Sequence, residues 1–168
     1  QPPTTGHAEN FKAVKNTSKG CDWFIYLSQS VDSKGSNPLD PDRKLYYAKK
    51  MFPSFAKHFR SGPKDPVAIL KELQTEGYDD AMFVVGSDRV QAMKWVKNYN
   101  GKDFFFRKLD VISSGDRDAD GDTFAISGTK MRRAAVADDF DAFRKGIPKG
   151  LNDKDTRKLM EEIKANMP

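Results

Sequence analysis

Hydrophobic positions in this chain fall into short continuous runs separated by stretches with helical spacing. Trp23–Leu27 and Met82–Val85 are apolar without interruption, which is typical of parallel strands buried on both faces. A third strand is expected over Phe104–Ile112. Elsewhere apolar residues recur every three or four positions, as in amphipathic helices. The expected helices cover residues 7–16, 41–52, 66–76, 86–99, 130–136, 139–145 and 153–166.

Several helix boundaries are marked by residues with known capping chemistry. Asp40-Pro41 is typical of an N-cap followed by a first-turn proline, and Pro53 should stop the helix that begins there. Gly77 should end the helix that starts at Pro66. Because strands and helices alternate, the sequence predicts one α/β domain over residues 1–168, with a parallel sheet and right-handed crossovers. Ligands of such sheets bind beyond the carboxyl ends of the strands.

Composition narrows the class of protein. Hydrophobic residues make up 38% and charged residues 32% of the 168 positions, as in folded water-soluble domains. No apolar run approaches the roughly 20 residues of a membrane span, and no signal peptide is visible. The single cysteine, Cys21, excludes an intramolecular disulfide and a cysteine-built zinc site. We therefore expect a reducing, cytoplasmic setting.

The chain is basic, with a formal charge of +5 and a pI near 9.2. Nucleic acid is one partner that such a charge fits, but polyanionic nucleotides account for it equally well. The basic sector is interpreted as a solvated face, since the aromatic residues near it look buried rather than interleaved with the cations. A nucleic-acid partner is therefore not expected. This sector comprises Lys94, Lys97, Lys102, Arg107 and Lys108.

Thr4-Thr5-Gly6-His7 opens the first expected helix. Backbone N–H groups at a helix start, together with the helix dipole, favour a bound phosphate. Gly6 lets the backbone approach a ligand closely, and His7 can donate a hydrogen bond to a phosphoryl oxygen. The alternative is that Thr5 only caps the helix and His7 is an ordinary surface residue.

Ile126-Ser127-Gly128-Thr129-Lys130-Met131-Arg132 is the second candidate phosphate site. It places hydroxyl groups at a helix start, and the i,i+3 spacing puts Thr129 and Arg132 on one helical face. The planar guanidinium of Arg132 suits phosphate oxygens. The alternative is an N-cap followed by a solvated basic turn.

Together and in this order, the two motifs resemble the (H/T)xGH and ISxTxxR signatures of a nucleotidyltransferase superfamily. Its members include nicotinamide-mononucleotide and phosphopantetheine adenylyltransferases, FAD synthetases and glycerol-phosphate cytidylyltransferases. The resemblance implies a three-layer α/β sandwich with a Rossmann-like parallel sheet. Gly128 stands where the family has a second serine, so a backbone N–H would replace one hydroxyl.

The resemblance also implies roles for individual residues. His7, Thr4, Thr5 and Gly6 would hold the α-phosphate, and Ser127, Gly128, Thr129, Lys130 and Arg132 would hold the β- and γ-phosphates. Mg²⁺ would bridge the triphosphate with few protein ligands, and no protein metal site is expected. A strand ending in a glycine-containing turn should precede the first motif. We expect that strand to have been removed, left out, or supplied by another segment.

Gly86-Ser87-Asp88 resembles the G-x-D turn that lines the nucleoside cleft in the family, although a carboxylate at a helix start is also ordinary capping. Trp95 is similar to a tryptophan of nicotinamide-nucleotide adenylyltransferases, with core packing as the favoured interpretation. Asn37-Pro38-Leu39 resembles a segment of several relatives, and Lys34 beside it would be a mobile lysine reaching the triphosphate.

The acidic loop Asp116–Asp122 imitates the first half of an EF-hand. Its twelfth position is Ser127 rather than the glutamate that calcium requires, so calcium is not expected. Arg117 in this loop is available for a phosphate.

The nucleotide favoured by the sequence is ATP. Thr4 stands at the first motif position, as in phosphopantetheine adenylyltransferases, whereas the cytidylyltransferases carry histidine there and an arginine before the second motif. CTP is the alternative. Trp95 favours nicotinamide mononucleotide as the acceptor, with FMN and phosphopantetheine left open.

A second class of hypothesis is a catalytically weak nucleotide-binding or structural module. The combined motifs also look like nucleotidyltransferase-like proteins encoded by phages, some within larger virion or replication polypeptides. The location would then be the host cytoplasm or the virion. A homo-oligomer, or association with the missing N-terminal segment, would be the corresponding assembly.

Overall fold

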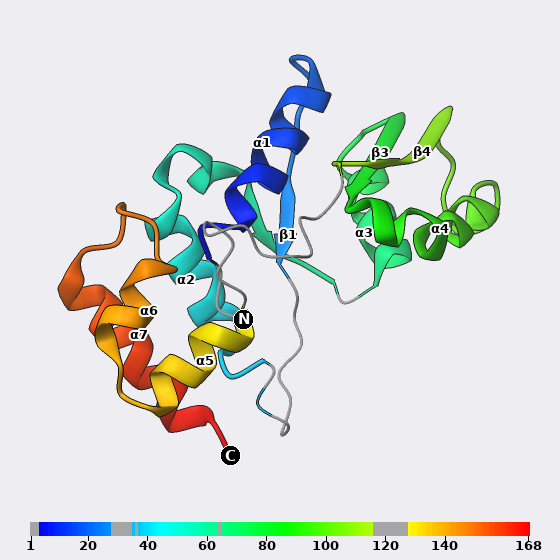
Figure 1. Ribbon diagram of the computed structural model, residues 1–168. Coiled ribbons are helices and arrows are strands. Elements are labelled where there is room, and N and C mark those ends of the chain that lie inside the picture. The colour runs from blue at the N-terminus through cyan, green and yellow to red at the C-terminus, as the bar shows by residue number, and fades with distance from the viewer. Residues whose placement is uncertain (1–3, 28–34, 36, 64, 116–127) are drawn as a thin grey trace.

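The computed structural model describes residues 4–27, 35, 37–63, 65–115 and 128–168, which form a mixed α/β fold (Figure 1). The described elements are, in chain order, α1 (His7–Ser18), β1 (Ile25–Leu27), α2 (Pro41–Met51), η1 (Pro53–His58), β2 (Phe59–Ser61), α3 (Pro66–Thr75), β3 (Asp80–Val85), η2 (Ser87–Arg89), α4 (Val90–Met93), η3 (Lys94–Tyr99), β4 (Lys108–Ser113), α5 (Gly128–Val136), α6 (Phe140–Lys145) and α7 (Asp153–Asn166); the η elements are 3₁₀ helices. Over these residues, no helix combines the length and apolarity needed to cross a membrane.

The described strands form two parallel pairs. β1 pairs with β2, with Ile25 opposite Phe59, and β3 pairs with β4 from Asp80 opposite Lys108 to Val85 opposite Ser113. Parallel pairing agrees with the sequence. Among the described strands, however, no ladder joins the two pairs into one sheet.

Side-chain caps set the helix starts that the sequence predicted. Asp40 Oδ1 accepts from the backbone N–H of Arg43 at 2.9 Å, and Pro41 is the first helical residue of α2. Asp65 caps α3 in the same way, with its carboxylate 2.8 Å from the N–H of Ala68. These helices and α7 confirm the predicted segments to within about a residue or two.

Three predicted segments were wrong in detail. The strand expected from Phe104 begins only at Lys108, because the side-chain amide of Asn100 bonds both the N–H and the carbonyl of Phe106. The helix expected over residues 86–99 is broken into η2, α4 and η3. β3 is not fully buried, since Met82 is 51% exposed. In addition, β2 was not predicted, because its three residues are too short for a hydrophobic period.

Two hydrophobic cores organise the part of the chain that the structure describes. The larger one joins α1, α2, β1 and β2 to the C-terminal helices, and includes Tyr47, Met131 and Phe143. The smaller one lies between α3, η3 and β4 around Leu70 and Val96. Figure 1 shows this division: α2, α5, α6 and α7 gather in one part, the β3–β4 pair in another, and α1 with β1 between them.

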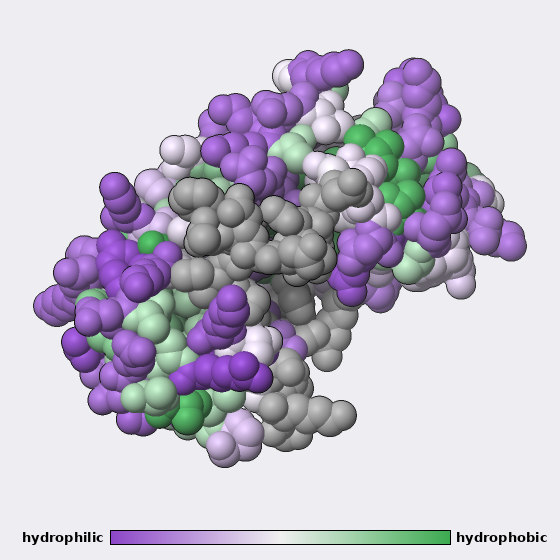
Figure 2. All heavy atoms as spheres, in the orientation of Figure 1, coloured by the Kyte–Doolittle hydropathy of each residue, from purple (hydrophilic) through white to green (hydrophobic). Residues whose placement is uncertain are grey.

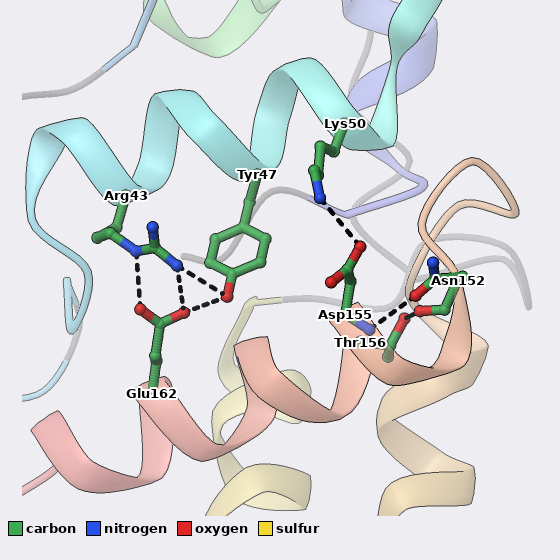
Figure 3. Close-up of polar contacts among 7 residues, drawn as sticks. All are labelled: Arg43, Tyr47, Lys50, Asn152, Asp155, Thr156 and Glu162. Carbon is green, nitrogen blue, oxygen red and sulfur yellow. Dashed lines mark hydrogen bonds and ion pairs between the residues drawn. The ribbon is translucent and has the colours of Figure 1, made fainter.

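A polar seam ties α2 to α7 (Figure 3). Arg43 Nε donates to Glu162 Oε1 at 2.7 Å, and the hydroxyl of the buried Tyr47 donates to the same carboxylate. Further along the same two helices, Lys50 Nζ of α2 lies 3.0 Å from Asp155 Oδ2 of α7. Burial alone would raise the pKa of Glu162, but the hydrogen bonds from Arg43 and Tyr47 outweigh it and hold this pKa below its usual range.

We expect this seam to contribute acid-sensitive stability. A carboxylate whose pKa is lowered by folding stabilises the protein fully above its unfolded pKa near 4.5 and loses that contribution as the pH falls through the folded pKa. Glu162→Gln should cost about 1–2 kcal/mol at pH 7, because the charge-assisted bonds are partly exposed to solvent. Urea unfolding of the parent chain and of Glu162→Gln at pH 7 and pH 3 measures this cost and its dependence on pH. An equal cost at the two pH values would contradict the assignment.

Candidate functional site

The start of α1 fixes the orientation of His7. The backbone N–H of Thr4 donates to Nδ1 of His7 at 3.0 Å, and the Thr4 hydroxyl lies 3.2 Å from the same nitrogen. Because Nδ1 accepts a hydrogen bond, the neutral ring carries its proton on Nε2. Thr4 is buried and His7 is exposed. In the first motif, the buried Thr4 therefore holds the exposed His7 ring in one orientation, with the ring proton on Nε2.

Thr5 does not cap α1, which corrects the alternative considered from the sequence. Gly6 occupies the N-cap position with no side-chain cap, and its φ of −63° is one that any residue adopts. The N–H of Thr5 instead donates to the carbonyl of Gly146 at 3.0 Å. This bond fastens the start of α1 to the end of α6.

The second motif has its predicted helical geometry where it is described. α5 begins at Gly128, and Arg132 Nη2 donates to Thr129 Oγ1 at 3.1 Å, which confirms that the two side chains share a face. Both line a pocket of about 380 Å³ that also touches Arg133, Gly35 and Met167. Lys130 is exposed one residue from Thr129. Lys34, Arg117, the 116–122 loop, Ile126 and Ser127 lie outside the described residues.

One core supports the helices of both motifs. Phe11 of α1 and Met131, Ala134 and Ala135 of α5 belong to the same buried cluster, and Ala8 packs against it. The bond from Thr5 to Gly146 adds a polar link from α1 to the same group of C-terminal helices. The structure therefore fixes the two candidate phosphate sites on a common scaffold.

The Gly86-Ser87-Asp88 turn is tied to the ends of β3 and β4. The N–H of Ser87 donates to the carbonyl of Gly115 at 3.3 Å, and that of Ser114 to the carbonyl of Val85 at 2.7 Å. The Ser114 hydroxyl lies 3.2 Å from Asn10 Oδ1 on α1. The turn is thus brought close to the helix that carries His7.

Asn10 and Ser114 were missed by sequence reasoning. Asn10 lies three residues after His7 and so falls on the same side of α1, which is the signal that would have found it. Ser114 gave no signal, since only the fold places the end of β4 beside α1.

Trp95 is not a core residue, which corrects the favoured interpretation of its role. It is 42% exposed and meets Tyr99 edge to face, with ring centroids 5.5 Å apart. Tyr99 and Phe105 are also exposed. Phe104 and Phe106 are buried as expected. The aromatic residues near the basic sector are therefore only partly buried, and that reason for setting nucleic acid aside holds only in part.

Metal-binding clusters of three or more histidine, cysteine or acidic side chains do not occur among the residues that the structure describes. Mg²⁺ carried by nucleotide phosphates stays a prediction. Comparison with protein-family models, with curated proteins and with solved structures finds no match to this chain. A function for this chain is therefore inferred from the motif residues and their geometry.

Proposed function

We propose that this protein is a nucleotidyltransferase, with AMP transfer from ATP to a phosphomonoester as its reaction. The observation that carries the proposal is the orientation of His7: Thr4 holds the ring through Nδ1 at an exposed helix start, which places the ring proton on Nε2. A phosphate at that helix start would meet backbone N–H groups, the positive end of the helix dipole and an imidazole donor together.

In the proposed reaction an acceptor phosphate oxygen attacks the α-phosphorus in line. The new O–P bond forms as the bond to the bridging β-phosphate oxygen breaks, and pyrophosphate leaves with that electron pair. The acceptor oxygen is already an anion, so no general base or covalent intermediate is required. Catalysis then consists of positioning and of stabilising the charge that builds on the α-phosphoryl oxygens.

The residues divide between the two ends of the triphosphate. His7, Thr4, Thr5 and Gly6 would hold the α-phosphate, and Thr129 with Arg132 would hold the β- and γ-phosphates. The bond from Arg132 to Thr129 supports this division, because it holds the guanidinium over the start of α5. Gly128, Lys130 and Ser127 would complete the second site, and Mg²⁺ would arrive with the nucleotide.

The favoured nucleotide is ATP, with CTP as the alternative, and nicotinamide mononucleotide is the favoured acceptor. The acceptor would lie near Ser87 and Asp88, because the contact between Ser114 and Asn10 brings this turn beside α1. Exposure of Trp95 leaves its ring available for stacking on a planar base.

We also propose that the two strand pairs are outer parts of one Rossmann-like parallel sheet in a three-layer sandwich. Support comes from the helices: α1 and α2 pack in the larger core, whereas α3 and η3 pack in the smaller one. The second candidate function is a nucleotide-binding module with weak turnover.

Binding of ATP with Mg²⁺ should raise the melting temperature. At about a hundredfold excess over Kd, a ligand that binds only the folded state adds about 2.7 kcal/mol of stability. Mg²⁺ alone and CTP with Mg²⁺ are the controls, and Arg132→Ala should abolish most of the shift. An unchanged melting curve with both nucleotides at millimolar concentration would contradict the proposal.

Turnover is tested separately by pyrophosphate release from ATP or CTP over a panel of phosphomonoester acceptors. Release that depends on one acceptor identifies an enzyme and its substrate. Nucleotide binding without release for any acceptor selects the module instead.

A further inference from the structure

Exposed aromatic rings and cations alternate along one segment of the chain. The rings are those of Trp95, Tyr99 and Phe105. Each has an exposed cation of the basic sector within two residues, namely Lys94, Lys97 and Arg107 respectively. Among the described residues, Tyr46 is the only other exposed aromatic residue. Because large aromatic rings are usually drawn into a core, three exposed rings in one segment indicate a binding surface.

The fold fixes this segment so that the rings stay outside. Val96, Phe104 and Phe106 fill the smaller core, and exposure alternates along Phe104, Phe105 and Phe106. The side-chain amide of Asn100 accepts from the N–H of Phe106 at 2.8 Å and donates to its carbonyl at 3.0 Å. These buried anchors and bonds orient the segment before any ligand binds, which lowers the entropic cost of binding.

A tight turn brings a further lysine beside the rings. The backbone N–H groups of Lys102 and Asp103 both donate to the carbonyl of Tyr99, at 3.0 and 3.1 Å. Tyr99 meets Trp95 edge to face, with an angle of 81° between the ring planes. In such a pair one ring uses only its edge, so its faces stay available for stacking on a flat ligand.

Carboxylates neutralise only part of the basic sector. Arg107 Nη2 lies 3.0 Å from Asp80 Oδ2, and Lys97 Nζ lies 3.4 Å from Asp110 Oδ1. These four side chains are about half exposed or more, and surface ion pairs of this kind contribute little to stability. Both cations can therefore exchange a carboxylate for another anion at small cost.

Three lysines of the basic sector pair with no carboxylate in the part of the chain that the structure describes: Lys94, Lys102 and Lys108. Residues 94–110 carry five cations and two carboxylates. This excess attracts polyanions, and cations spread along a segment match a chain of regularly spaced phosphates. The rings between the cations favour a polyanion that also carries flat bases.

We propose that residues 94–108 form a binding surface for single-stranded nucleic acid. Bases stack on the three exposed rings, and the cations pair with the phosphates between them. Because every base has a π-face, binding is tolerant of sequence. A duplex fits less well, since its bases are already stacked on one another. The buried Val96 also holds η3 against the core, so η3 does not project into a groove.

This surface is separate from the proposed nucleotide site. η3 packs in the smaller core, whereas α1 and α5 pack in the larger one. Figure 1 draws β4 and α4 well apart from α5. Figure 2 shows hydrophilic side chains around a smaller hydrophobic area in the part of the surface where β3, β4 and α4 lie. The proposal therefore stands or falls independently of nucleotidyl transfer.

Binding is tested by fluorescence anisotropy with labelled oligothymidylate and oligouridylate of about 12 nucleotides. We expect both to bind, with a Kd of about 1–100 µM that rises with salt. A mixed-sequence duplex of equal length should bind at least about tenfold more weakly, because its bases cannot stack on the rings. The two single strands together show whether the 2′-hydroxyl contributes to binding.

Stacking is tested with Phe105→Ala, which should raise the Kd at least about fivefold. Phe105 is chosen over Trp95 because Trp95 is also the proposed stacking partner of an acceptor. Tyr46→Ala is the matched control and should leave the Kd unchanged. Its ring is exposed beside Arg43 and Lys50, but these cations are paired with carboxylates of α7.

The phosphate contacts are tested by replacing the three unpaired lysines with glutamine. Each phosphate contact to a single strand contributes about 0.7 to the slope of log K against log salt, so this slope should fall by about 2. The control replaces three exposed lysines outside the sector and has the same net charge, and it should keep the slope of the parent chain. These control positions are Lys49, Lys57 and Lys149.

Every other outcome overturns the proposal. No binding by about 100 µM protein would remove the surface altogether. Equal binding of the duplex, or an unchanged Kd for Phe105→Ala, would exclude stacking. Equal loss in both lysine variants would assign binding to net charge alone. Displacement by polyglutamate would favour an acidic protein as the partner. Displacement by ATP with Mg²⁺, or loss of binding in Arg132→Ala, would place the strand on the proposed nucleotide site.

Discussion

Replacing His7 with alanine should lower the turnover number about 10²–10³-fold while changing ATP affinity little. The reason is that Nε2–H is used chiefly as negative charge develops on the α-phosphoryl oxygens, and an interaction made mainly in the transition state appears in kcat. Because Thr4 holds the ring through Nδ1, the donor is oriented before the nucleotide binds. Initial rates at saturating ATP, together with a binding titration, measure both quantities.

Arg132→Ala is the contrasting variant. The guanidinium of Arg132 would bind phosphate oxygens that are charged already in the ground state. Loss of this group should therefore raise the Kd for the triphosphate more than it lowers kcat. If His7→Ala instead loses binding and keeps its rate at saturation, the roles assigned to the two residues are reversed.

His58→Ala controls for the removal of a histidine in general. His58 is the only other histidine of the chain, and it stacks on Trp23 with ring centroids 3.5 Å apart while its Nδ1 lies 2.9 Å from the Trp23 carbonyl oxygen. This position is structural, so the variant should lower the melting temperature and leave kcat unchanged. A loss of rate equal to that of His7→Ala would remove the distinction between the two histidines.

The parts of this fold that sequence predicted well are those governed by local chemistry. Asp40, Asp65 and Asn152 cap their helices through their own side chains, and such caps act within three residues. The pairing of Thr129 with Arg132 is likewise fixed by the helical repeat. The motif geometry that belongs to a single helix was therefore accessible without a structure.

What sequence did not predict depends on contacts between distant segments. The strand expected at Phe104 is displaced by the side chain of Asn100, and Trp95 is exposed although its residue type favours burial. Met82–Val85 has the apolar pattern of a strand buried on both faces, yet β3 is only partly covered. An apolar run indicates a strand, but how deeply that strand is buried depends on helices and strands that pack against it from elsewhere in the chain.

Phe143→Ala should lower the free energy of unfolding by about 3–5 kcal/mol, the usual cost of removing a buried aromatic ring from a packed core. Phe143 is fully buried in α6 within the cluster that joins α1 and α5. It lies three residues before Gly146, whose carbonyl accepts from Thr5. The variant should therefore also weaken nucleotide binding, because the starts of both motif helices depend on this packing.

Phe105→Ala is the matched control, since the same change is made where the ring is 66% exposed. It should alter stability by no more than about 0.5 kcal/mol, as is usual for surface substitutions. Urea unfolding of both variants, followed by ATP titration under conditions where each stays folded, separates the two effects. If Phe143→Ala loses stability but binds ATP as the parent chain does, α6 supports the core without positioning the start of α1. The bond from Thr5 to Gly146 would then have no part in holding the phosphate site.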